Sequence, residues 1–279
     1  MPETDEAALP SLADDHALLI DAVREAGADV MRHYRERRFD AWDKGDASPV
    51  TDADIAANVI LRKRLTKGRR ARYGWLSEES AEDPTRQAAD RVWIVDPIDG
   101  TRAFIDRRAE FTVCAALIER GQAVASVIYN PLTDELFEAV AGGGARCNGT
   151  PLRHSGRSDL SGCRMLGASY MFKHPGWPKP WPDMAISYRN STSYRMALVA
   201  AGAQDAALAL LPKADWDVAP GTLLLEEAGA QASDHLGGNY QFNQPTPWQP
   251  ALVCAAPDLH HQLLARLDHL PADLKELAT

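Results

Sequence analysis

The chain has 279 residues, of which 45% are hydrophobic and 25% are charged, the composition of a globular protein that can bury a large core. Its formal net charge of −9 argues against a surface that coats a nucleic acid polymer and against a basic face that lies on a membrane. A small anionic substrate stays compatible with this charge, because bound metal ions reverse the sign of the electrostatic field locally.

The N-terminal segment and the cysteines favour a cytoplasmic location. Residues 1–15 are acidic and lack the basic and apolar regions of a signal peptide. No apolar run approaches the length that spans a bilayer, so we expect no membrane insertion. The cysteines are widely spaced and form no C-x-x-C pair, which is typical of reduced thiols. They are Cys114, Cys147, Cys163 and Cys254.

The first part of the chain predicts two helices joined by a polar link. Residues 12–37 repeat apolar side chains at helical spacing, with charged residues on the other face. Residues 42–49 are polar and suit a turn or a short hairpin. A second helix is predicted from Thr51, because Thr51 and Asp54 have the spacing of a capping box. Its expected apolar face consists of Ile55, Val59 and Leu65.

The middle of the chain predicts antiparallel strands. Apolar runs of strand length follow one another, and the turn at 119–122 suits a hairpin. These runs are residues 92–95, 111–118, 123–129 and 136–140. The turn at 148–151 marks a boundary, so we expect an N-terminal sub-domain over 1–150 and a C-terminal sub-domain over 151–279.

The C-terminal part predicts helices at 194–203, 216–228 and 259–267, a strand at 205–211 and a loop, rich in proline and tryptophan, at 171–182. Pro220 is expected in the first turn of the middle helix, and Gly229 at its end. Helices and strands alternate without a regular βαβ rhythm. We therefore predict a layered α/β (α+β) sandwich in which the two sub-domains share a cleft.

The most informative stretch is Trp-Ile-Val-Asp-Pro-Ile-Asp-Gly-Thr at residues 93–101. An Asp-Gly pair alone is a common turn dipeptide, but here Asp96 ends an apolar strand, where an unpaired carboxylate is costly to bury. Asp99 follows in the same turn, and the motif holds no lysine or arginine. A divalent cation that prefers oxygen ligands would satisfy both carboxylates, and the carbonyl of Ile98 can add a third oxygen.

These residues resemble the signatures of the inositol monophosphatase superfamily of magnesium-dependent, lithium-sensitive phosphatases. Residues 96–101 are similar to its Asp-Pro-x-Asp-Gly-Thr motif, and residues 77–80 to its upstream acidic motif. Residues 216–221, followed by Glu-Ala-Gly at 227–229, are similar to its C-terminal motif. The resemblance covers about residues 18–267. It implies the αβαβα sandwich that this family shares with fructose-1,6-bisphosphatase.

The resemblance implies two to three Mg²⁺ ions bound by oxygen ligands. Glu78, Asp96 and the Ile98 carbonyl would hold the first ion. Asp96, Asp99 and Asp217 would hold the second, and a third, weaker ion would lie near Glu78. Glu79 is left open as either a ligand or a solvated neighbour. Two departures from the family pattern touch no ligand position, and they are Pro220 and Ala230.

The implied reaction is hydrolysis of a phosphate monoester by in-line attack of metal-activated water. Its catalytic residues would be Asp54, Thr101 and Glu78, with Asp54 polarising the threonine hydroxyl. The carboxylate of Asp54 also suits the N-terminus of a helix, and both interpretations can hold together. Free N–H groups at Gly100 and Thr101 would contact the phosphate. The substrate-binding residues expected from the resemblance are Asp99, Gly100, Thr101, Ser191, Arg195 and Asp217.

Two small phosphorylated substrates compete within the superfamily. Residues 76–79, 110–113 and 191–195 are more similar to the nucleotidases that act on adenosine 3',5'-bisphosphate. In that interpretation the planar fork of Arg195 contacts the second phosphate, although a surface arginine is an equally good interpretation. The aromatic loop at 172–181 would then stack on adenine, or else pack on the core. The alternative substrate is inositol-1-phosphate.

Two further classes stay open from the sequence. One is a non-catalytic, metal-binding regulatory protein on the same fold, which the presence of every expected ligand disfavours. The other, more distant, is a fructose-1,6-bisphosphatase, which shares the aspartate signature but lacks the C-terminal motif. The resemblance is also compatible with a homodimer.

Overall fold

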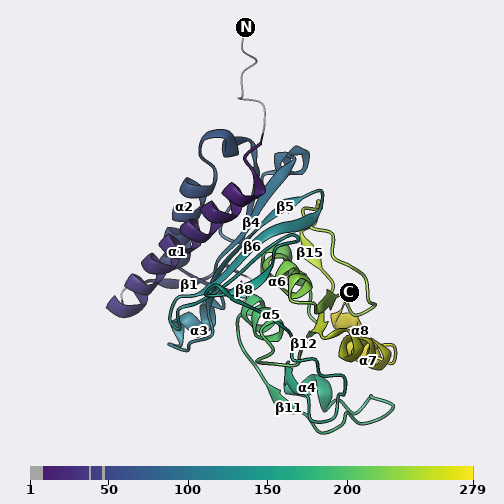
Figure 1. Ribbon diagram of the computed structural model, residues 1–279. Coiled ribbons are helices and arrows are strands. Elements are labelled where there is room, and N and C mark those ends of the chain that lie inside the picture. Colours follow the sequence, from purple (N-terminus) through teal and green to yellow (C-terminus); the bar gives the residue numbers. More distant parts are fainter. Residues whose placement is uncertain (1–8, 38, 46–47, 279) are drawn as a thin grey trace.

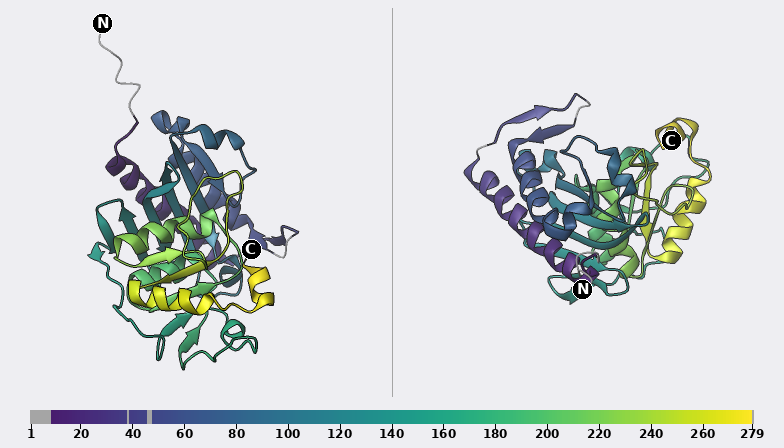
Figure 2. Two further views of the ribbon diagram at one scale, coloured as in Figure 1. Left: turned by 90° about the vertical axis from the view of Figure 1, so that its right-hand side faces the viewer. Right: turned by 90° about the horizontal axis from the view of Figure 1, so that it is seen from above.

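Helices and sheets alternate in layers, in the order α, β, α, β, α (Figure 1). The structure is a computed structural model that describes residues 9–37, 39–45 and 48–278. Seen from above, the N-terminal helices lie on one side of the large sheet, and the C-terminal half lies on the other (Figure 2). The expected layered α/β sandwich is therefore confirmed. Within the described residues, no helix is both long enough and apolar enough to cross a membrane.

The first layer consists of α1 (Leu12–Glu36) and α2 (Asp52–Leu65). The predicted capping box is present, because Thr51 and Asp54 exchange hydrogen bonds at the start of α2. The predicted apolar face of α2 is wrong for two of its three residues, since Ile55 and Val59 are exposed. The box turns Asp54 toward the sheet, so the residues one, two and three turns further along that face are the buried ones. They are Asn58, Leu61 and Leu65.

The second layer is a seven-stranded sheet in which the strands follow one another in sequence order. All neighbours pair antiparallel except β3 and β4, which pair parallel. Arg120 and Gly121 both have positive φ and close the predicted hairpin between β5 and β6. The strands are β3 (Gly74–Ser77), β4 (Arg91–Asp99), β5 (Thr112–Glu119), β6 (Gln122–Asn130), β7 (Glu135–Val140), β8 (Gly144–Cys147) and β9 (Thr150–Pro151).

A hairpin and three short helices lie next to this sheet in the chain. The polar link forms a hairpin of β1 (Ala41–Asp43) and β2 (Pro49–Thr51), as predicted, while residues 46–47 lie outside the described part. A short helix, α3 (Thr101–Ile105), follows β4 directly. Two 3-10 helices, η1 (Gly68–Arg72) and η2 (Pro84–Ala88), flank β3.

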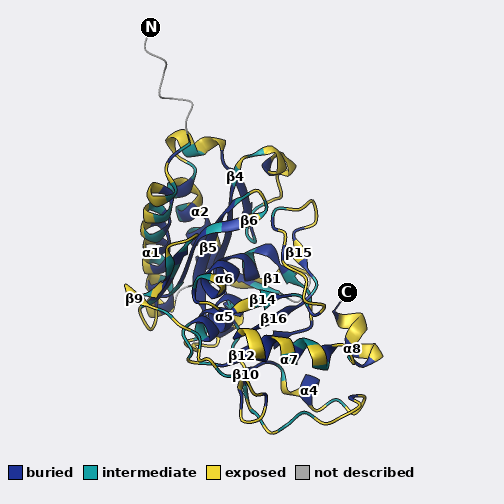
Figure 3. Cartoon of the chain, turned by 45° about the vertical axis from the view of Figure 1, so that its right-hand side comes forward, coloured by how far each residue is buried: buried dark blue, intermediate teal, exposed yellow. Residues whose placement is uncertain are grey.

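The middle layer contains α5 (Thr192–Ala200) and α6 (Asp215–Glu227), which are buried between the two sheets (Figure 3). Helix α6 begins at Asp215, so Pro220 lies in its second turn and not in the first turn that we predicted. Proline has no N–H to bond the carbonyl four residues earlier. That carbonyl, of Trp216, instead accepts the thiol of Cys114 at 3.9 Å.

The second sheet is five-stranded, and short helices cover its outer face. The loop predicted at 171–182 contains the end of α4 (Ser169–Phe172). Its aromatic residues Trp177 and Trp181 pack with the helices beyond this sheet, so they belong to the core and form no lid. In order, the strands are β11 (Ala185–Ser187), β10 (Arg164–Leu166), β12 (Ala206–Ala209), β16 (Leu252–Ala255) and β14 (Gln231–Ser233), and the outer helices are α7 (Pro257–Leu267) and α8 (Ala272–Leu277).

Candidate active site

A bulge in β4 brings Asp96 and Asp99 to the same face of the sheet. Asp96 pairs with Cys114 and Asp99 with Thr112, so β4 has one residue more than β5 between these pairs. Side chains three residues apart on a regular strand would point to opposite faces, and the extra residue cancels this alternation. Oxygens of both aspartates and the sulfur of Cys114 lie within 4.8 Å of one another.

Gly100 allows the chain to turn from β4 into α3. Its φ of 92° lies in the left-handed region, and a Cβ at this position would lie 2.6 Å from the carbonyl oxygen of Glu110. Only glycine fits this position without strain. The turn leaves Thr101 as the first residue of α3, with its side chain next to β4.

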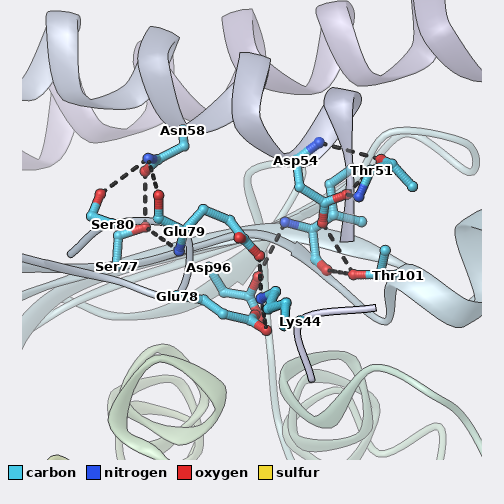
Figure 4. Close-up of polar contacts among 11 residues, drawn as sticks. Lys44, Thr51, Asp54, Asn58, Ser77, Glu78, Glu79, Ser80, Asp96 and Thr101 are labelled. Atoms are coloured by element: carbon cyan, nitrogen blue, oxygen red, sulfur yellow. Dashed lines mark hydrogen bonds and ion pairs between the residues drawn. The ribbon is translucent and has the colours of Figure 1, made fainter. Parts of the chain in front are cut away.

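Thr101 forms a hydrogen-bonded pair with Asp54 of α2 (Figure 4). The Thr101 hydroxyl lies 3.1 Å from Oδ1 of Asp54 and 3.0 Å from the carbonyl oxygen of Ile98, both of which are acceptors. The other carboxylate oxygen of Asp54 accepts the backbone N–H and the hydroxyl of Thr51. Burial raises the pKa of Asp54 to about 6, although these hydrogen bonds act in the opposite direction.

The turn after β3 presents Glu78 and Glu79, and Asn58 of α2 fixes its backbone (Figure 4). The amide of Asn58 donates to the carbonyl of Glu79 at 3.0 Å, and it accepts from the hydroxyl of Ser77 at 2.8 Å. Lys44 of the β1–β2 hairpin donates to Glu78 at 2.8 Å and also bonds Glu79. Burial disfavours the charge of Lys44, but the two glutamates more than offset this and raise its pKa.

The C-terminal half contributes Asp217 and the N-terminus of α5. Asp217 lies in the first turn of α6 and accepts the N–H of Ala214 at 3.1 Å. Asp99 reaches across from β4 and accepts the N–H groups of Thr192 at 3.1 Å and Ser193 at 2.7 Å. A carboxylate at a helix N-terminus is stabilised by the free N–H groups and by the helix dipole.

These side chains open on one cleft of about 500 Å³. Among the residues expected at the site, Asp54, Ser191 and Arg195 do not line the cleft and lie buried behind its wall. Ser191 bonds Asp99, and Arg195 bonds the first turn of its own helix. The expected residues that line the cleft are Glu78, Asp96, Ile98, Asp99, Gly100, Thr101 and Asp217.

Burial and mutual repulsion make this acidic cluster unfavourable without a cation. Burial and the neighbouring Asp217 raise the pKa of Asp99 to about 6. Burial raises the pKa of Glu78 to about 7, although the ammonium group of Lys44 acts in the opposite direction. The pKa of Asp96 is raised well above its usual value by burial and by the surrounding carboxylates. Among the described residues, no ion pair involves Asp96 or Asp99. Buried oxygen donors of this kind fit a hard divalent cation.

The sequence interpretation missed several residues of the site, among them an asparagine and two lysines. Asn58 carried a signal, since it follows Asp54 by one helical turn on the same face. Lys44 bonds Glu78 from the turn between two short strands, and Lys213 lines the cleft from another short strand. Their positions depend on strand pairing that no local pattern reveals.

Fold and site together define a metal-dependent phosphatase. A model of the inositol monophosphatase family matches residues 12–270, and the chain belongs to this family. It is 36% identical over 230 residues to an inositol-1-monophosphatase of Rhizobium meliloti, covering 79% of this chain and 85% of the relative. It is 34% identical over 239 residues to the Nus factor SuhB of Escherichia coli, covering 81% and 87%.

A solved structure shows the same architecture. The extragenic suppressor protein suhB from Bartonella henselae aligns with a TM-score of 0.78 at 31% identity, covering 90% of this chain and 97% of that chain. An inositol monophosphatase from Thermotoga maritima aligns with a TM-score of 0.76 at 24% identity, which shows the fold alone.

Proposed function

We propose that this chain hydrolyses a small phosphate monoester with Mg²⁺ as cofactor, using two to three ions. The observation that carries this proposal is the pair of Thr101 and Asp54, which opens on the carboxylate cluster. A hydroxyl whose proton is held by a carboxylate is arranged to accept a hydrogen bond from an attacking water.

We assign the metal ligands among the residues that line the cleft. Glu78, Asp96 and the carbonyl of Ile98 would hold one ion, and Asp96, Asp99 and Asp217 a second, with a third near Glu78. When bound, the ions lower the pKa of water and neutralise charge on the phosphate oxygens. Glu79 bonds Lys44, which also bonds Glu78. We therefore propose that Glu79 helps to position Glu78 and is not itself a metal ligand.

The chain's own residues orient the reaction. The attacking water would donate a hydrogen bond to the hydroxyl oxygen of Thr101, whose own proton is directed at Asp54, and Glu78 would help to position that water. Gly100 and Thr101 line the cleft next to the aspartates, where we place the reacting phosphate. Asp99 of the first half and Asp217 of the second half both line the cleft, and they would hold the substrate between the two halves of the chain.

For the substrate we propose a nucleoside 3',5'-bisphosphate, because the cleft wall carries positive charge at Lys213 beyond the carboxylate cluster. Inositol-1-phosphate is the second candidate, because the Rhizobium meliloti relative is named an inositol-1-monophosphatase. A non-catalytic role is the third, because other relatives are named Nus factor SuhB.

A phosphate-release assay separates these candidates. The panel contains adenosine 3',5'-bisphosphate, inositol-1-phosphate and fructose-1,6-bisphosphate, each with Mg²⁺ and with EDTA. We expect turnover of the bisphosphate nucleotide that stops in EDTA and is inhibited by Li⁺. Equal turnover in EDTA would refute the metal mechanism. No phosphate release from any ester would favour the non-catalytic role.

A further inference from the structure

Lys213 is a residue of the second half of the chain that lines the cleft. It belongs to the short strand β13 (Lys213–Ala214), which pairs with β15 (Trp248–Gln249) immediately before α6. This pairing fixes the backbone of Lys213 relative to Asp217, which follows on α6. The Lys213 side chain lines the same cleft as Asp99 and Asp217.

The ammonium group of Lys213 has no carboxylate in direct contact. Within the described part of the chain it forms no ion pair, although Asp217 and Asp99 lie near enough to attract it. Burial lowers the pKa of Lys213, and the nearby guanidinium of Arg195 lowers it further. Within the residues that the structure describes, the charge of this partly buried lysine is therefore compensated by the expected metal ligands Asp217 and Asp99.

Arg195 adds a second positive charge behind the same wall. Its guanidinium donates to the carbonyl of Ser191 and to the hydroxyl of Thr192, which are both neutral acceptors. Its face covers the ring of Tyr188, with 5.2 Å between the guanidinium carbon and the ring centroid. Tyr188 itself lines the cleft. Arg195 therefore contributes to the positive potential of this wall without reaching its surface.

The positive charges of Lys213 and Arg195 matter most when the neighbouring carboxylates bind metal ions. Asp99 and Asp217 would then interact with the metal ions, and no other carboxylate of the described residues forms an ion pair with Lys213 or Arg195. A buried or half-buried cation without a counter-charge is costly. A second anionic group on the substrate would supply this counter-charge.

We propose that Lys213 contacts a second phosphate group of the substrate and makes the cleft selective for bisphosphates over monophosphates. This inference rests on the proposed phosphatase function. It replaces the expectation that Arg195 makes this contact, because Lys213 lines the cleft and Arg195 is buried behind Tyr188 and Thr192.

The test compares adenosine 3',5'-bisphosphate with adenosine 3'-monophosphate in four proteins. These are the wild type, Lys213→Met, Lys213→Arg and, as a matched control, Lys63→Met on the exposed surface of α2. Circular dichroism verifies that each variant folds. We expect the wild type and the control to prefer the bisphosphate by about tenfold or more in kcat/KM, the effect of one charge-assisted hydrogen bond.

In Lys213→Met, that preference should fall at least about tenfold, mainly through a higher KM for the bisphosphate, and Lys213→Arg should restore part of it. Equal losses on both nucleotides would overturn the inference, since Lys213 would then act on the reacting phosphate or on the fold. A wild type that hydrolyses only inositol-1-phosphate would also overturn it, while the phosphatase function would stand. A wild type that releases phosphate from no ester would refute the proposed function itself.

Discussion

The hydroxyl of Ser191 donates to Oδ2 of Asp99 at 2.6 Å, across a sequence separation of 92 residues. The same hydroxyl accepts the N–H of Tyr194 and caps α5. One buried serine therefore joins the carboxylate of the first sheet to the helix layer of the second half of the chain. The position of Asp99 is set by both halves, and so the site exists only when they are packed together.

Replacing Asp99 with asparagine should abolish turnover without unfolding the protein. Asparagine keeps one oxygen that can still accept the hydroxyl of Ser191 and the N–H of Ser193. Its amide nitrogen then faces the N–H of Thr192, and the side chain lacks the negative charge that a divalent cation needs. We expect kcat to fall by more than about 100-fold, because losing a metal ligand should reduce activity more than losing a residue that hydrogen-bonds to a ligand. The melting temperature should shift by no more than about 4 °C.

The matched control for this variant is Asp106→Asn, an exposed aspartate just after α3. It should keep the wild-type rate. A rate near the wild type in Asp99→Asn would contradict the metal assignment.

Replacing Ser191 with alanine should weaken both metal binding and stability. The variant loses the cap of α5, which is worth about 0.5–2 kcal/mol, and it removes one of the two hydrogen bonds to Oδ2 of Asp99, leaving the one from Ser193. We expect the Mg²⁺ concentration for half-maximal activity to rise roughly 10- to 100-fold, while urea denaturation reports the lost cap. A stability loss with unchanged Mg²⁺ dependence would show that Ser191 serves the fold alone.

The pair of Thr101 and Asp54 should control kcat more than KM. Thr101→Ala removes the hydroxyl that the carboxylate of Asp54 polarises, and we expect kcat to fall about 10²- to 10⁴-fold, the range for a general base. Thr101→Ser keeps the hydroxyl and should retain most of the activity. Steady-state kinetics at saturating Mg²⁺ measure both. Equal rates for alanine and serine variants would exclude the hydroxyl from the reaction.

The stability of the metal-free protein should fall as the pH rises, and bound Mg²⁺ should remove this loss. The folded protein raises the pKa of Asp99 to about 6 and of Glu78 to about 7, from 3.8 and 4.5. The folded state therefore binds more protons than the unfolded state between about pH 4 and pH 7, so these groups destabilise the metal-free protein as the pH rises. Bound Mg²⁺ favours the ionised carboxylates and removes this penalty.

We therefore expect the gain in melting temperature from Mg²⁺ over EDTA to grow as the pH rises from 5 to 8. Comparing the two conditions at each pH cancels the contribution of groups far from the cleft. The variant Asp99→Asn should flatten this difference. A Mg²⁺ gain that stays constant over the same pH range would contradict the carboxylate cluster as the metal site.

Local signals in the sequence predicted most of the fold and the central site motif. The capping box at Thr51, the hairpin at 119–122 and the turn at Gly100 depend on residues a few positions apart, and the structure contains all three. The expected face of α2 was wrong because apolar residues at 55 and 59 outweighed the polar signal of Asp54 and Asn58, which are the residues that face the sheet.

Sequence patterns could not predict the contacts between residues that are far apart in the chain. The role of Ser191 in holding Asp99 depends on packing between elements 92 residues apart. The hydrogen bond from the Cys114 thiol to Trp216 depends on where Pro220 falls in α6. The aromatic loop also contains no local signal that decides between a lid and the core, and the surface available beyond the second sheet decided it.

The β4 bulge sets a limit on how this scaffold can change. If one residue were inserted into β5 between Thr112 and Cys114, the ladder would regain its regular pairing, and Asp99 would turn toward the layer of α1 and α2. The acidic motif would be intact in such a chain, and its metal pocket would be dismantled. In this fold, the relative length of β4 and β5 therefore decides whether the carboxylates lie close enough together to form the metal site.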